Sequence, residues 1–358
     1  MAGPVRFPSE GKLAMRVVVT GASGAVGRHV ADRLKGRGNI EVVALDRTAS
    51  DGVTQFELLT DNLTEHLHAG DSLVHLAATP AGFAGDGGAA KADRALAKRV
   101  LDAARTAGVD HVLLASSSMV YGAWPDNPVP LTESAVVRPN PEFRFAVVRG
   151  EIETLGEQWV EETGGALTIV RPATTLARGR ENGLALLLRN SAALRNRDGD
   201  APAQFLHAED FAAAVELLVA ERHAGVFNVA PNGWLRVAEV NALRGVPETP
   251  LRVPAPVITA VSDARRRLGA ATHPGLTPYL QHPWVVANDK LKALGWEPEF
   301  TNEEAYVAGY QPSRFDGVNA KRRQELALGA AGAAVAAGAV GLAGAVSWVV
   351  RRSRGRSS

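Results

Sequence analysis

The amino-acid sequence predicts an α/β fold with a doubly wound parallel sheet, a smaller C-terminal lobe and a C-terminal transmembrane helix. Three observations carry this prediction. Short apolar runs typical of buried strands alternate with amphipathic segments typical of helices over the first half of the chain. A glycine-rich turn joins the first strand to the first helix, and an uncharged run of 25 residues occupies 326–350. Because strand and helix alternate, we expect parallel strands in one sheet with helices on both faces.

The first strand and helix follow a loose leader at residues 1–14. MRVVVT, at 15–20, is a short buried strand. VGRHVADRLKGRG then places Val26, Val30 and Leu34 at helical spacing. The later elements are predicted from similar patterns, with strands at 41–46, 72–78, 111–118 and 167–172 and helices at 89–107 and 142–153.

The pattern changes after Pro172, where prolines separate short elements. These prolines are Pro202, Pro231, Pro247, Pro250, Pro254 and Pro256. They predict a smaller lobe over 172–310 that is interleaved with the last strands of the sheet. The sheet domain itself is expected at 15–171, and the polar residues 311–325 are expected to link the body to the run at 326–350.

The glycine-rich turn TGASGAVG, at residues 20–27, predicts a dinucleotide site. Gly21 permits a sharp turn, Gly24 lets the backbone approach a pyrophosphate, and Gly27 lets the helix pack on the strand. The free N–H groups and the dipole at the start of the helix attract phosphates. The residues of this turn predicted to contact the cofactor are Gly21, Ser23, Gly24, Ala25, Val26 and Gly27.

Asp46 ends the second strand, 19 residues after Gly27. Its carboxylate suits the hydroxyl groups of an adenosine ribose and repels a 2′-phosphate, which favours NAD over NADP. Arg47 beside it is able to accept that phosphate, so NADP stays open as the alternative.

The composition limits the class of protein. Hydrophobic residues make up 46% of the chain and charged residues 22%, which is typical of a protein that buries a core. The chain has no cysteine, which excludes disulfides and thiolate metal sites. The net charge is +1, but residues 321–358 hold seven basic residues and one acidic residue, a charge of +6, so the other 320 residues carry −5. An acidic body argues against nucleic acid as a partner.

The run at 326–350 is long enough to cross a bilayer at ~1.5 Å per residue. A basic tail at 351–358 follows it, and Trp348 near its end is typical of an interfacial aromatic. Its ten alanines and five glycines also suit a flexible tail, which is the competing interpretation. The N-terminus lacks the long apolar run of a secretory signal. We therefore expect a single-pass C-terminal anchor in the cell membrane, with the lipid bilayer as a partner and the globular domain in the cytoplasm.

Residues 15–310 resemble the extended short-chain dehydrogenase/reductases, in particular the NAD-dependent epimerase/dehydratase family. The resemblance rests on five matches in the same order: TGASGAVG at 20–27, LVHLAA at 73–78, VLDAARTAGVDHVLLASSSMVYG at 100–122, TIVRP at 168–172, and FLHAEDFAAAV at 205–215 with GVFNVA at 225–230. It implies a Rossmann fold that binds NAD. It also implies a C-terminal lobe for a small-molecule substrate, often a nucleotide sugar, and a homodimer is among the assemblies expected.

The same resemblance assigns further residues to the cofactor. Leu76, Ala77 and Ala78 would pass under it. Three more positions would lie beside it, namely Ser116, Arg149 and Pro172.

The catalytic residues of that family are a serine and a Tyr-x-x-x-Lys pair. The resemblance places the serine at Ser117, the tyrosine position at Phe145 and the lysine position at Arg149. No shift of register recovers the pair, because none of the four tyrosines, Tyr121, Tyr279, Tyr306 and Tyr310, has lysine four residues on. Phenylalanine has no exchangeable proton and arginine keeps its own. Loss of a positioned acid–base group lowers a rate by ~10²–10⁴-fold.

A second departure lies on the helix at 89–107. The family often carries asparagines where this chain has Asp93 and Arg99. The proton-relay waters that those asparagines would hold are therefore in doubt as well.

Other polar residues suit structural roles better than chemical ones. His75 lies inside a buried strand and is interpreted as a core histidine. His207, Glu209 and Asp210 match a segment that supports the substrate lobe in the resembled family. His273, His282 and Trp284 suit a surface loop, with a pocket lining as the alternative, and no histidines have metal-ligand spacing.

Two functions follow from these residues. The first is a membrane-anchored, NAD-dependent epimerase, dehydratase or reductase whose proton donor has moved from position 145, for example to Tyr279, to a histidine of the lobe or to water. The second is a catalytically silent NAD(H)-binding sensor or scaffold at the membrane.

Overall fold

The structure, a computed structural model of the 358-residue chain, describes residues 15–79, 87–178, 194–196, 201–243, 251–253 and 274–309. Among these residues, no helix is both long and apolar enough to span a membrane. The predicted leader, the linker, the transmembrane helix and the basic tail all lie outside the described residues.

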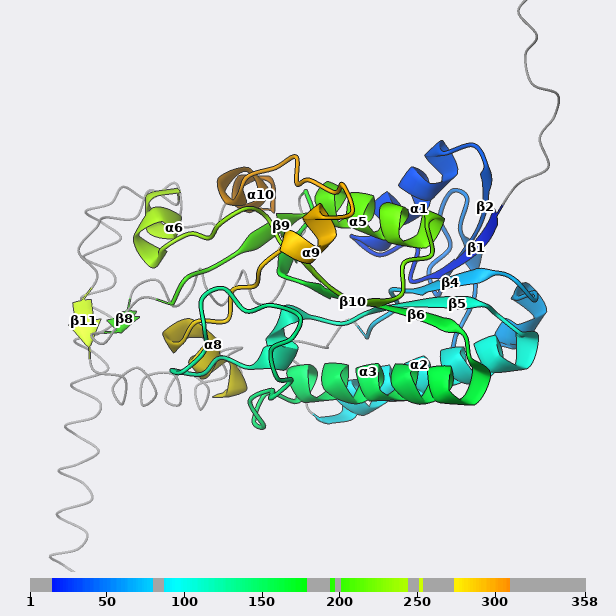
Figure 1. Cartoon of the computed structure of the whole chain (residues 1–358), viewed down its shortest axis with the longest axis horizontal. Coiled ribbons are helices and arrows are strands. Elements are labelled where there is room, and N and C mark those ends of the chain that lie inside the picture. The colour runs from blue at the N-terminus through cyan, green and yellow to red at the C-terminus, as the bar shows by residue number, and fades with distance from the viewer. Residues whose placement is uncertain are drawn as a thin grey trace, which may run out of the picture. The chain divides into compact units, whose positions relative to one another are not determined.

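A seven-stranded sheet forms the centre of the described body (Figure 1). Its strands are β1 (Met15–Thr20), β2 (Ile40–Asp46), β3 (Thr54–Gln55), β4 (Ser72–His75), β5 (His111–Ala115), β6 (Ala166–Pro172) and β10 (Gly225–Val229). They lie in the order β10-β6-β5-β4-β1-β2-β3, and each neighbouring pair is parallel. The chain moves outward from β1 to β2 and β3, then returns to the other side of β1 with β4. The strand order therefore reverses between β1 and β4, where doubly wound sheets bind ligands at their carboxyl ends.

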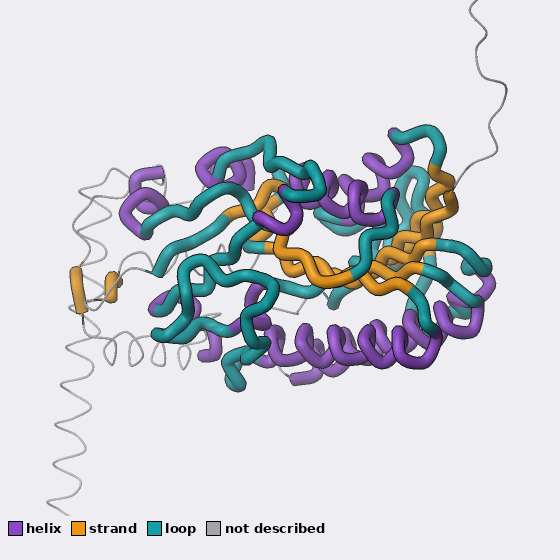
Figure 2. The backbone as a smooth tube through the Cα atoms, in the orientation of Figure 1, coloured by secondary structure: helices purple, strands orange, loops and turns teal. Residues whose placement is uncertain are grey.

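Helices cover both faces of this sheet, as the predicted fold requires. Helices α1 (Gly27–Gly36) and α5 (Ala208–Ala220) lie on one face, and α2 (Gly87–Ala107) and α3 (Arg144–Thr163) lie side by side on the other (Figures 1 and 2). Strand β1 shows why two layers form. Val17 and Val19 pack in the apolar cluster that contains α1 and α5, while Val18 packs in the cluster that contains α2 and α3. Alternate side chains of a strand point to opposite faces, so a run of valines is buried on both.

The remaining elements form the lobe and the connections. They are η1 (Leu63–His66), η2 (Ser118–Tyr121), β7 (Thr174–Leu176), β8 (Leu194–Asn196), β9 (Phe205–His207), α6 (Val237–Leu243), β11 (Leu251–Val253), η3 (Pro274–Leu276), α8 (Thr277–Gln281), α9 (Asp289–Lys292) and α10 (Asn302–Gly309). Strands β7 and β9 pair in parallel, as do β8 and β11. Because β10 pairs with β6, the residues after Pro172 complete the sheet as well as forming the lobe.

Two of the predicted strands are shorter in the structure. The strand expected at 72–78 ends at His75, because the chain turns there to pass beneath the glycine-rich turn. The strand expected at 111–118 ends at Ala115, and Ser117 then caps the 3₁₀ turn η2, its hydroxyl accepting a hydrogen bond from Met119 N. In both places the residues beyond the strand are the ones assigned to the site.

Candidate functional site

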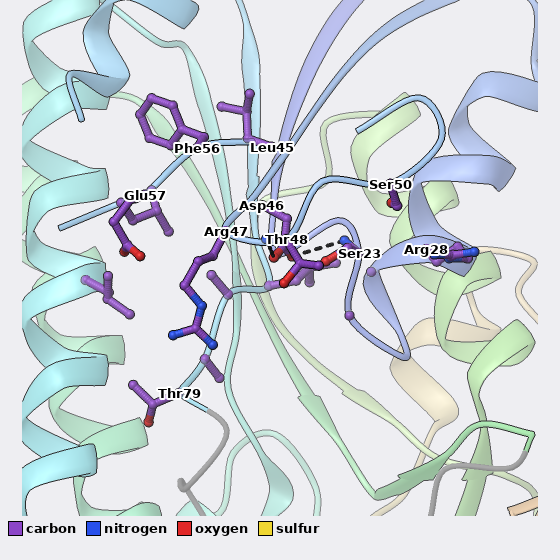
Figure 3. Close-up of a pocket in the computed structure, with 18 of the residues that line it drawn as sticks. Ser23, Arg28, Leu45, Asp46, Arg47, Thr48, Ser50, Phe56, Glu57 and Thr79 are labelled. Carbon is purple, nitrogen blue, oxygen red and sulfur yellow. Dashed lines mark hydrogen bonds between the residues drawn. The ribbon is translucent and has the colours of Figure 1, made fainter. Parts of the chain in front are cut away.

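A cavity of about 670 Å³ opens at the carboxyl ends of β1, β2 and β4 (Figure 3). Its volume falls within the roughly 300–1,000 Å³ that small-molecule and cofactor sites occupy. Its lining comes from the glycine turn, from the end of β2 and the residues that follow it, from the residues after β4, and from one residue of α2. These residues are Gly21, 23–28, Leu45–Ser50, Phe56–Leu59, Leu76–Thr79 and Leu96. The cavity therefore gathers the predicted residues of the glycine turn, Asp46, Arg47 and Leu76–Ala78. Ser116, Ser117, Arg149 and Pro172 do not line it.

The glycines at the start of α1 are required by close backbone approaches. Gly21 has φ +82°, and a Cβ there would lie 2.5 Å from Ala77 N. A Cβ at Gly27 would lie 2.0 Å from Gly21 O. At Gly24 the only atom within 4 Å of such a Cβ is Gly21 O, at 3.1 Å, so a side chain there would press against that carbonyl on a residue that lines the cavity. Gly21 and Gly27 shape the turn, whereas Gly24 leaves room for a ligand.

The N-terminus of α1 supplies donors to the same cavity. The backbone N–H groups of Ala25, Val26 and Gly27 have no acceptor within the described part of the chain. Val26, at the N-cap, makes no side-chain cap hydrogen bond. Unpaired N–H groups at the positive end of a helix dipole bind phosphate groups. This end of the cavity therefore fits the pyrophosphate of a dinucleotide.

Asp46 connects the glycine turn to the loop after β2. Its Oδ2 accepts a hydrogen bond from Ser23 N at 3.0 Å, and its Oδ1 accepts one from Thr48 N at 3.1 Å (Figure 3). A carboxylate has about four lone-pair positions, so these bonds leave acceptor capacity for ribose hydroxyls. The exposed Arg47 extends toward Thr79 in Figure 3 and makes no ion pair with the described residues.

Phe145 and Arg149, which the resemblance assigns to the tyrosine and lysine positions, lie on α3, and their side chains contact each other. Arg149 is only 7% exposed. Its Nη1 donates to Ala115 O at 3.2 Å, and its Nη2 donates to Asp93 Oδ2, also at 3.2 Å. Its guanidinium lies over the ring of Phe145. Burial lowers the pKa of Arg149 while Asp93 raises it, and the guanidinium stays charged because arginine does not lose its proton in proteins.

Phe145 packs at the edge of an apolar cluster formed by Met119, Ala123, Phe143, Ala146, Leu276, Tyr279 and Trp284. Tyr279 is the one tyrosine of this cluster. It is 1% exposed, and its hydroxyl donates to Met119 O at 2.7 Å. Burial raises the pKa of this hydroxyl, which makes it a poor proton donor or acceptor near neutral pH. The structure thus gives Tyr279 a packing role.

The serines after β5 are both held by the protein itself. Ser117 Oγ accepts from Met119 N at 3.2 Å and so caps the 3₁₀ turn η2 after the strand. Ser116 Oγ donates to Glu153 Oε1. Glu153 also forms a buried, two-bond ion pair with Arg171, through Nε at 3.0 Å and Nη2 at 2.5 Å.

This buried network reaches the last strand of the sheet. Arg171 Nη1 donates to the Tyr121 hydroxyl at 2.8 Å, and that hydroxyl donates to Asn228 Oδ1 at 2.8 Å. Sequence reasoning assigned no role to Arg171 or Asn228. The signal was present, since a charged residue in the apolar strand TIVRP needs a buried partner.

His75 in the sheet and His207 and Asp210 in the lobe are each held by contacts within the protein. His75 is buried and its Nδ1 lies 2.8 Å from Thr20 Oγ1; burial, with the charge of Arg149, lowers its pKa to about 3. His207 caps α5 by accepting from Glu209 N. Asp210 accepts from the backbone N–H groups of Glu299 and Phe300 and so holds the lobe to α5. No group of three or more His, Asp or Glu side chains suited to a metal ion occurs among the residues described.

Comparison with known proteins shows a family model and several relatives that match this chain. The model of the NAD dependent epimerase/dehydratase family matches residues 17–230. An uncharacterized protein of Mycobacterium tuberculosis is 28% identical over 313 residues, which cover 81% of this chain and 82% of the relative. The UDP-glucuronic acid decarboxylase 1 of Arabidopsis thaliana is 26% identical over 317 residues, covering 82% of this chain and 68% of the relative.

Solved structures share the fold. The UDP-glucuronic acid 4-epimerase of Bacillus cereus, in complex with UDP-glucuronic acid and NAD, superposes with a TM-score of 0.63 at 17% identity, covering 83% of this chain and 98% of that one. A tyrosine-to-phenylalanine mutant of that epimerase, in complex with a 4-fluoro analogue and NAD, gives the same TM-score, identity and coverage.

Proposed function

Because the chain belongs to the NAD-dependent epimerase/dehydratase family, we propose that it binds NAD, and a nucleotide sugar beside it, without catalysing the proton transfer of an epimerase. The observation that carries this proposal is the state of positions 145 and 149. Phe145 offers no hydroxyl, and two N–H groups of Arg149 are engaged by Asp93 and Ala115. In this proposal the protein is a sensor or scaffold that responds to its ligands.

The cavity supports the choice of cofactor. The amides of Ala25, Val26 and Gly27 would hold the pyrophosphate, and the open side of Gly24 would leave room for it. Asp46 would accept hydrogen bonds from the adenosine ribose. Bound NAD would supply a hydride acceptor at its nicotinamide ring. The carboxylate of Asp46 favours NAD over NADP, because it would repel a 2′-phosphate.

The nucleotide sugar is proposed from the relatives. The B. cereus epimerase is described in complex with UDP-glucuronic acid and NAD, and the tyrosine-to-phenylalanine mutant of that protein in complex with a UDP-sugar analogue and NAD. In that epimerase, loss of one tyrosine hydroxyl is thus compatible with ligand binding. We propose the same combination for this chain, with Ser117 and the lobe beside the sugar.

An active enzyme is the competing function, and the intact glycine turn favours it. This alternative needs a proton donor other than Phe145. Tyr279 does not supply one, since its hydroxyl is buried and bonded to Met119 O. His75 does not supply one either, because its low pKa keeps it neutral and it is enclosed by the sheet.

Titration calorimetry and turnover assays on the full chain separate the two functions. We expect saturable heat with NAD, and no new sugar nucleotide or absorbance at 340 nm after incubation with UDP-glucose or UDP-glucuronic acid. The Phe145→Tyr/Arg149→Lys variant provides the comparison. If the wild-type chain turns over as fast as this variant, the silent function is wrong; if NAD gives no heat, both functions are wrong.

We further propose that residues 326–350 anchor the protein in the cell membrane with its globular domain in the cytoplasm. The uncharged run, the basic flanks and Trp348 support this proposal. Fractionation of cells that express the chain with and without residues 321–358 tests it. The anchor is wrong if the full chain stays in the soluble fraction.

A further inference from the structure

The turn at 57–61 forms one wall of the cavity, which its first three residues line. The turn is closed on itself, because Thr60 N and Asp61 N donate to Glu57 O at 3.1 and 2.8 Å. In addition, Glu57 N donates to Asp61 Oδ2 at 2.7 Å. These bonds give the turn its shape, but they do not hold it against the rest of the molecule.

Arg99 of α2 holds this turn against the helix. Its Nε donates to Leu58 O at 2.8 Å, and its Nη2 donates to Asp61 O at 3.3 Å. Both acceptors are backbone carbonyls, so the contact depends on the placement of two N–H groups more than on charge. The planar guanidinium presents its donors in a fixed fork, which suits two carbonyls of one turn. Arg99 also stands where the resembled family often carries asparagine, whose side chain is shorter.

Helix α2 also contributes to the cavity directly, because Leu96, one helical turn before Arg99, lines it. In the turn itself, Leu58 packs against the apolar cluster that contains α2 and α3, whereas Leu59 is 46% exposed and lines the cavity. A ligand that covers such an exposed apolar side chain removes its surface from water, which favours binding. Arg99 therefore fixes the backbone that carries Leu59 at the cavity wall.

The apolar wall and the glycine turn lie on different sides of Asp46. In Figure 3, Phe56 and Glu57 lie on one side of Asp46, and Ser23 and Arg28 lie on the other. Phe56 N donates to Asp46 O at 2.8 Å, so the wall begins next to the carboxylate proposed for the adenosine ribose. The flat base of that adenosine would therefore meet the wall, while the pyrophosphate would meet the glycine turn.

We propose that Arg99 is a positioning residue for the ligand: it holds the turn at 57–61 so that Leu59 covers the base of the adenosine. Arg99 itself is not among the residues that line the cavity, so it acts through the wall. This inference rests on the proposed function, in which the cavity binds NAD. Arg99 should therefore affect ligands that carry the base and spare a ligand that consists of phosphate alone.

Titration calorimetry with ADP, NAD and inorganic pyrophosphate tests this assignment on the full chain. ADP carries the base, whereas pyrophosphate offers only the group that the amides of α1 would bind. We expect Arg99→Ala to weaken ADP and NAD by about fivefold, the loss typical of one net hydrogen bond, and to leave pyrophosphate within about twofold. Arg105→Ala removes an exposed arginine from the same helix; it is the matched control and should change none of these affinities.

Two further variants show the route of the effect. Leu59→Ala should weaken ADP by a similar factor. In that background Arg99→Ala should add less than about twofold, because both changes remove the same contact. Arg99→Lys keeps the charge but lacks the planar fork, so it should weaken ADP by about threefold and leave pyrophosphate unchanged. It replaces Arg99→Ala if that variant fails to fold.

The possible results differ clearly. A selective loss of affinity for ADP and NAD that is not additive with Leu59→Ala supports the positioning role. Equal losses for ADP and pyrophosphate would show that Arg99 acts through its charge, additive losses would show that it does not act through Leu59, and unchanged ADP affinity would show that the wall does not depend on it. Each of these three results overturns the inference.

The wild-type chain separates this inference from the proposed function. If it binds ADP no more tightly than pyrophosphate, the base has no contact and the inference fails, while the phosphate end of the proposed cofactor site survives. If it binds neither NAD nor ADP nor pyrophosphate, the proposed function itself fails.

Discussion

The guanidinium carbon of Arg149 lies 5.1 Å from the centroid of the Phe145 ring. The two residues that the resemblance assigns to the tyrosine and lysine positions of the family therefore contact each other, one helical turn apart. A desolvated cation over an aromatic face stabilises the fold by up to about 2 kcal/mol. This contact contains no titratable hydroxyl.

Removal of the charge of Asp93 should destabilise the fold. Asp93→Asn leaves the buried guanidinium of Arg149 without its counter-ion, and we expect a loss of roughly 3 kcal/mol in the free energy of unfolding. Urea denaturation measures it. Adding Arg149→Leu to Asp93→Asn should recover part of the loss. The exposed ion pair of Asp102 with Lys98 is the control, where Asp102→Asn should cost less than about 1 kcal/mol.

Stability should fall as the pH falls through the range of the buried histidines. Burial lowers the pKa of His111 to about 4, and His75 has a pKa of about 3, against 6.5 in the unfolded chain. Below pH 6.5 the unfolded state binds protons that the folded state does not, so folding stability is present above that pH. As the pH falls below 6.5, this stability is lost by up to about 1.4 kcal/mol per pH unit for each histidine. The loss continues to about pH 4 for His111 and to about pH 3 for His75.

Urea midpoints at pH 7.5, 6 and 5 measure this dependence. His111→Asn should reduce the slope of stability against pH, because it removes one of the two buried imidazoles. The Nε2 atom of this imidazole lies 2.8 Å from Thr168 Oγ1. A flat profile for the wild-type chain would contradict the neutral, buried state of both histidines.

Substitutions of the glycines in the turn should affect the free energy of unfolding and the affinity for NAD to different degrees. Gly24→Ala places its methyl group 3.1 Å from Gly21 O and beside the cavity, so we expect a loss of about 1 kcal/mol in unfolding free energy and at least a tenfold loss of NAD affinity. Gly21→Ala meets Ala77 N and a positive φ, so it should cost about 2 kcal/mol or more. Gly36→Ala, with no neighbour within 4 Å, should alter neither property. Unchanged NAD affinity in Gly24→Ala would argue against a phosphate at this turn.

Asp46 should set the preference between NAD and NADP. Asp46→Asn keeps an acceptor for Ser23 N or Thr48 N but removes the negative charge. We expect weaker binding of NAD and stronger binding of NADP, since Arg47 then faces a 2′-phosphate without a neighbouring carboxylate. Competition between the two cofactors measures the ratio. Arg47→Ala in the same background should abolish the gain for NADP; a gain that persists would assign the phosphate to other groups.

The hydroxyl of Tyr279 should matter for stability alone. Tyr279→Phe removes one of the two hydrogen bonds that Met119 O accepts and leaves the one from Gly122 N, so we expect a loss of about 1 kcal/mol. Sugar-nucleotide assays on this variant provide the second measurement. Any activity of the wild-type chain that disappears in Tyr279→Phe would show that the proton donor had moved to this residue after all.

Much of the sheet was predictable from local sequence. MRVVVT is apolar on both faces, and it forms β1 over the expected residues. Helix α2 begins at Gly87, two residues before the predicted start at 89. Helix α3 was predicted to end at Glu153 and continues ten residues further, to Thr163. Strand ends were harder, because nothing in SLVHLAA distinguishes the paired residues from those that turn beneath Gly21.

Within the site, the glycine turn and Asp46 could be located because their spacing is local. The contact of Asp93 with Arg149 joins residues 56 apart, and the Arg171–Tyr121 bond joins residues 50 apart. No periodicity in one sequence pairs such positions. Asp93 and Arg149 meet because helices α2 and α3 pack side by side, and Arg171 meets Tyr121 because β6 pairs with β5, which Tyr121 follows.

The pairing of β10 with β6 also determines how the chain can be shortened. Residues 225–229 pair with residues 168–172, so a fragment ending near 171 would expose an apolar strand with unpaired N–H and C=O groups. Such an open edge recruits other strands, and the fragment should aggregate. During synthesis the sheet likewise stays incomplete until Val229 has left the ribosome, so nascent chains are vulnerable to misassembly over that interval.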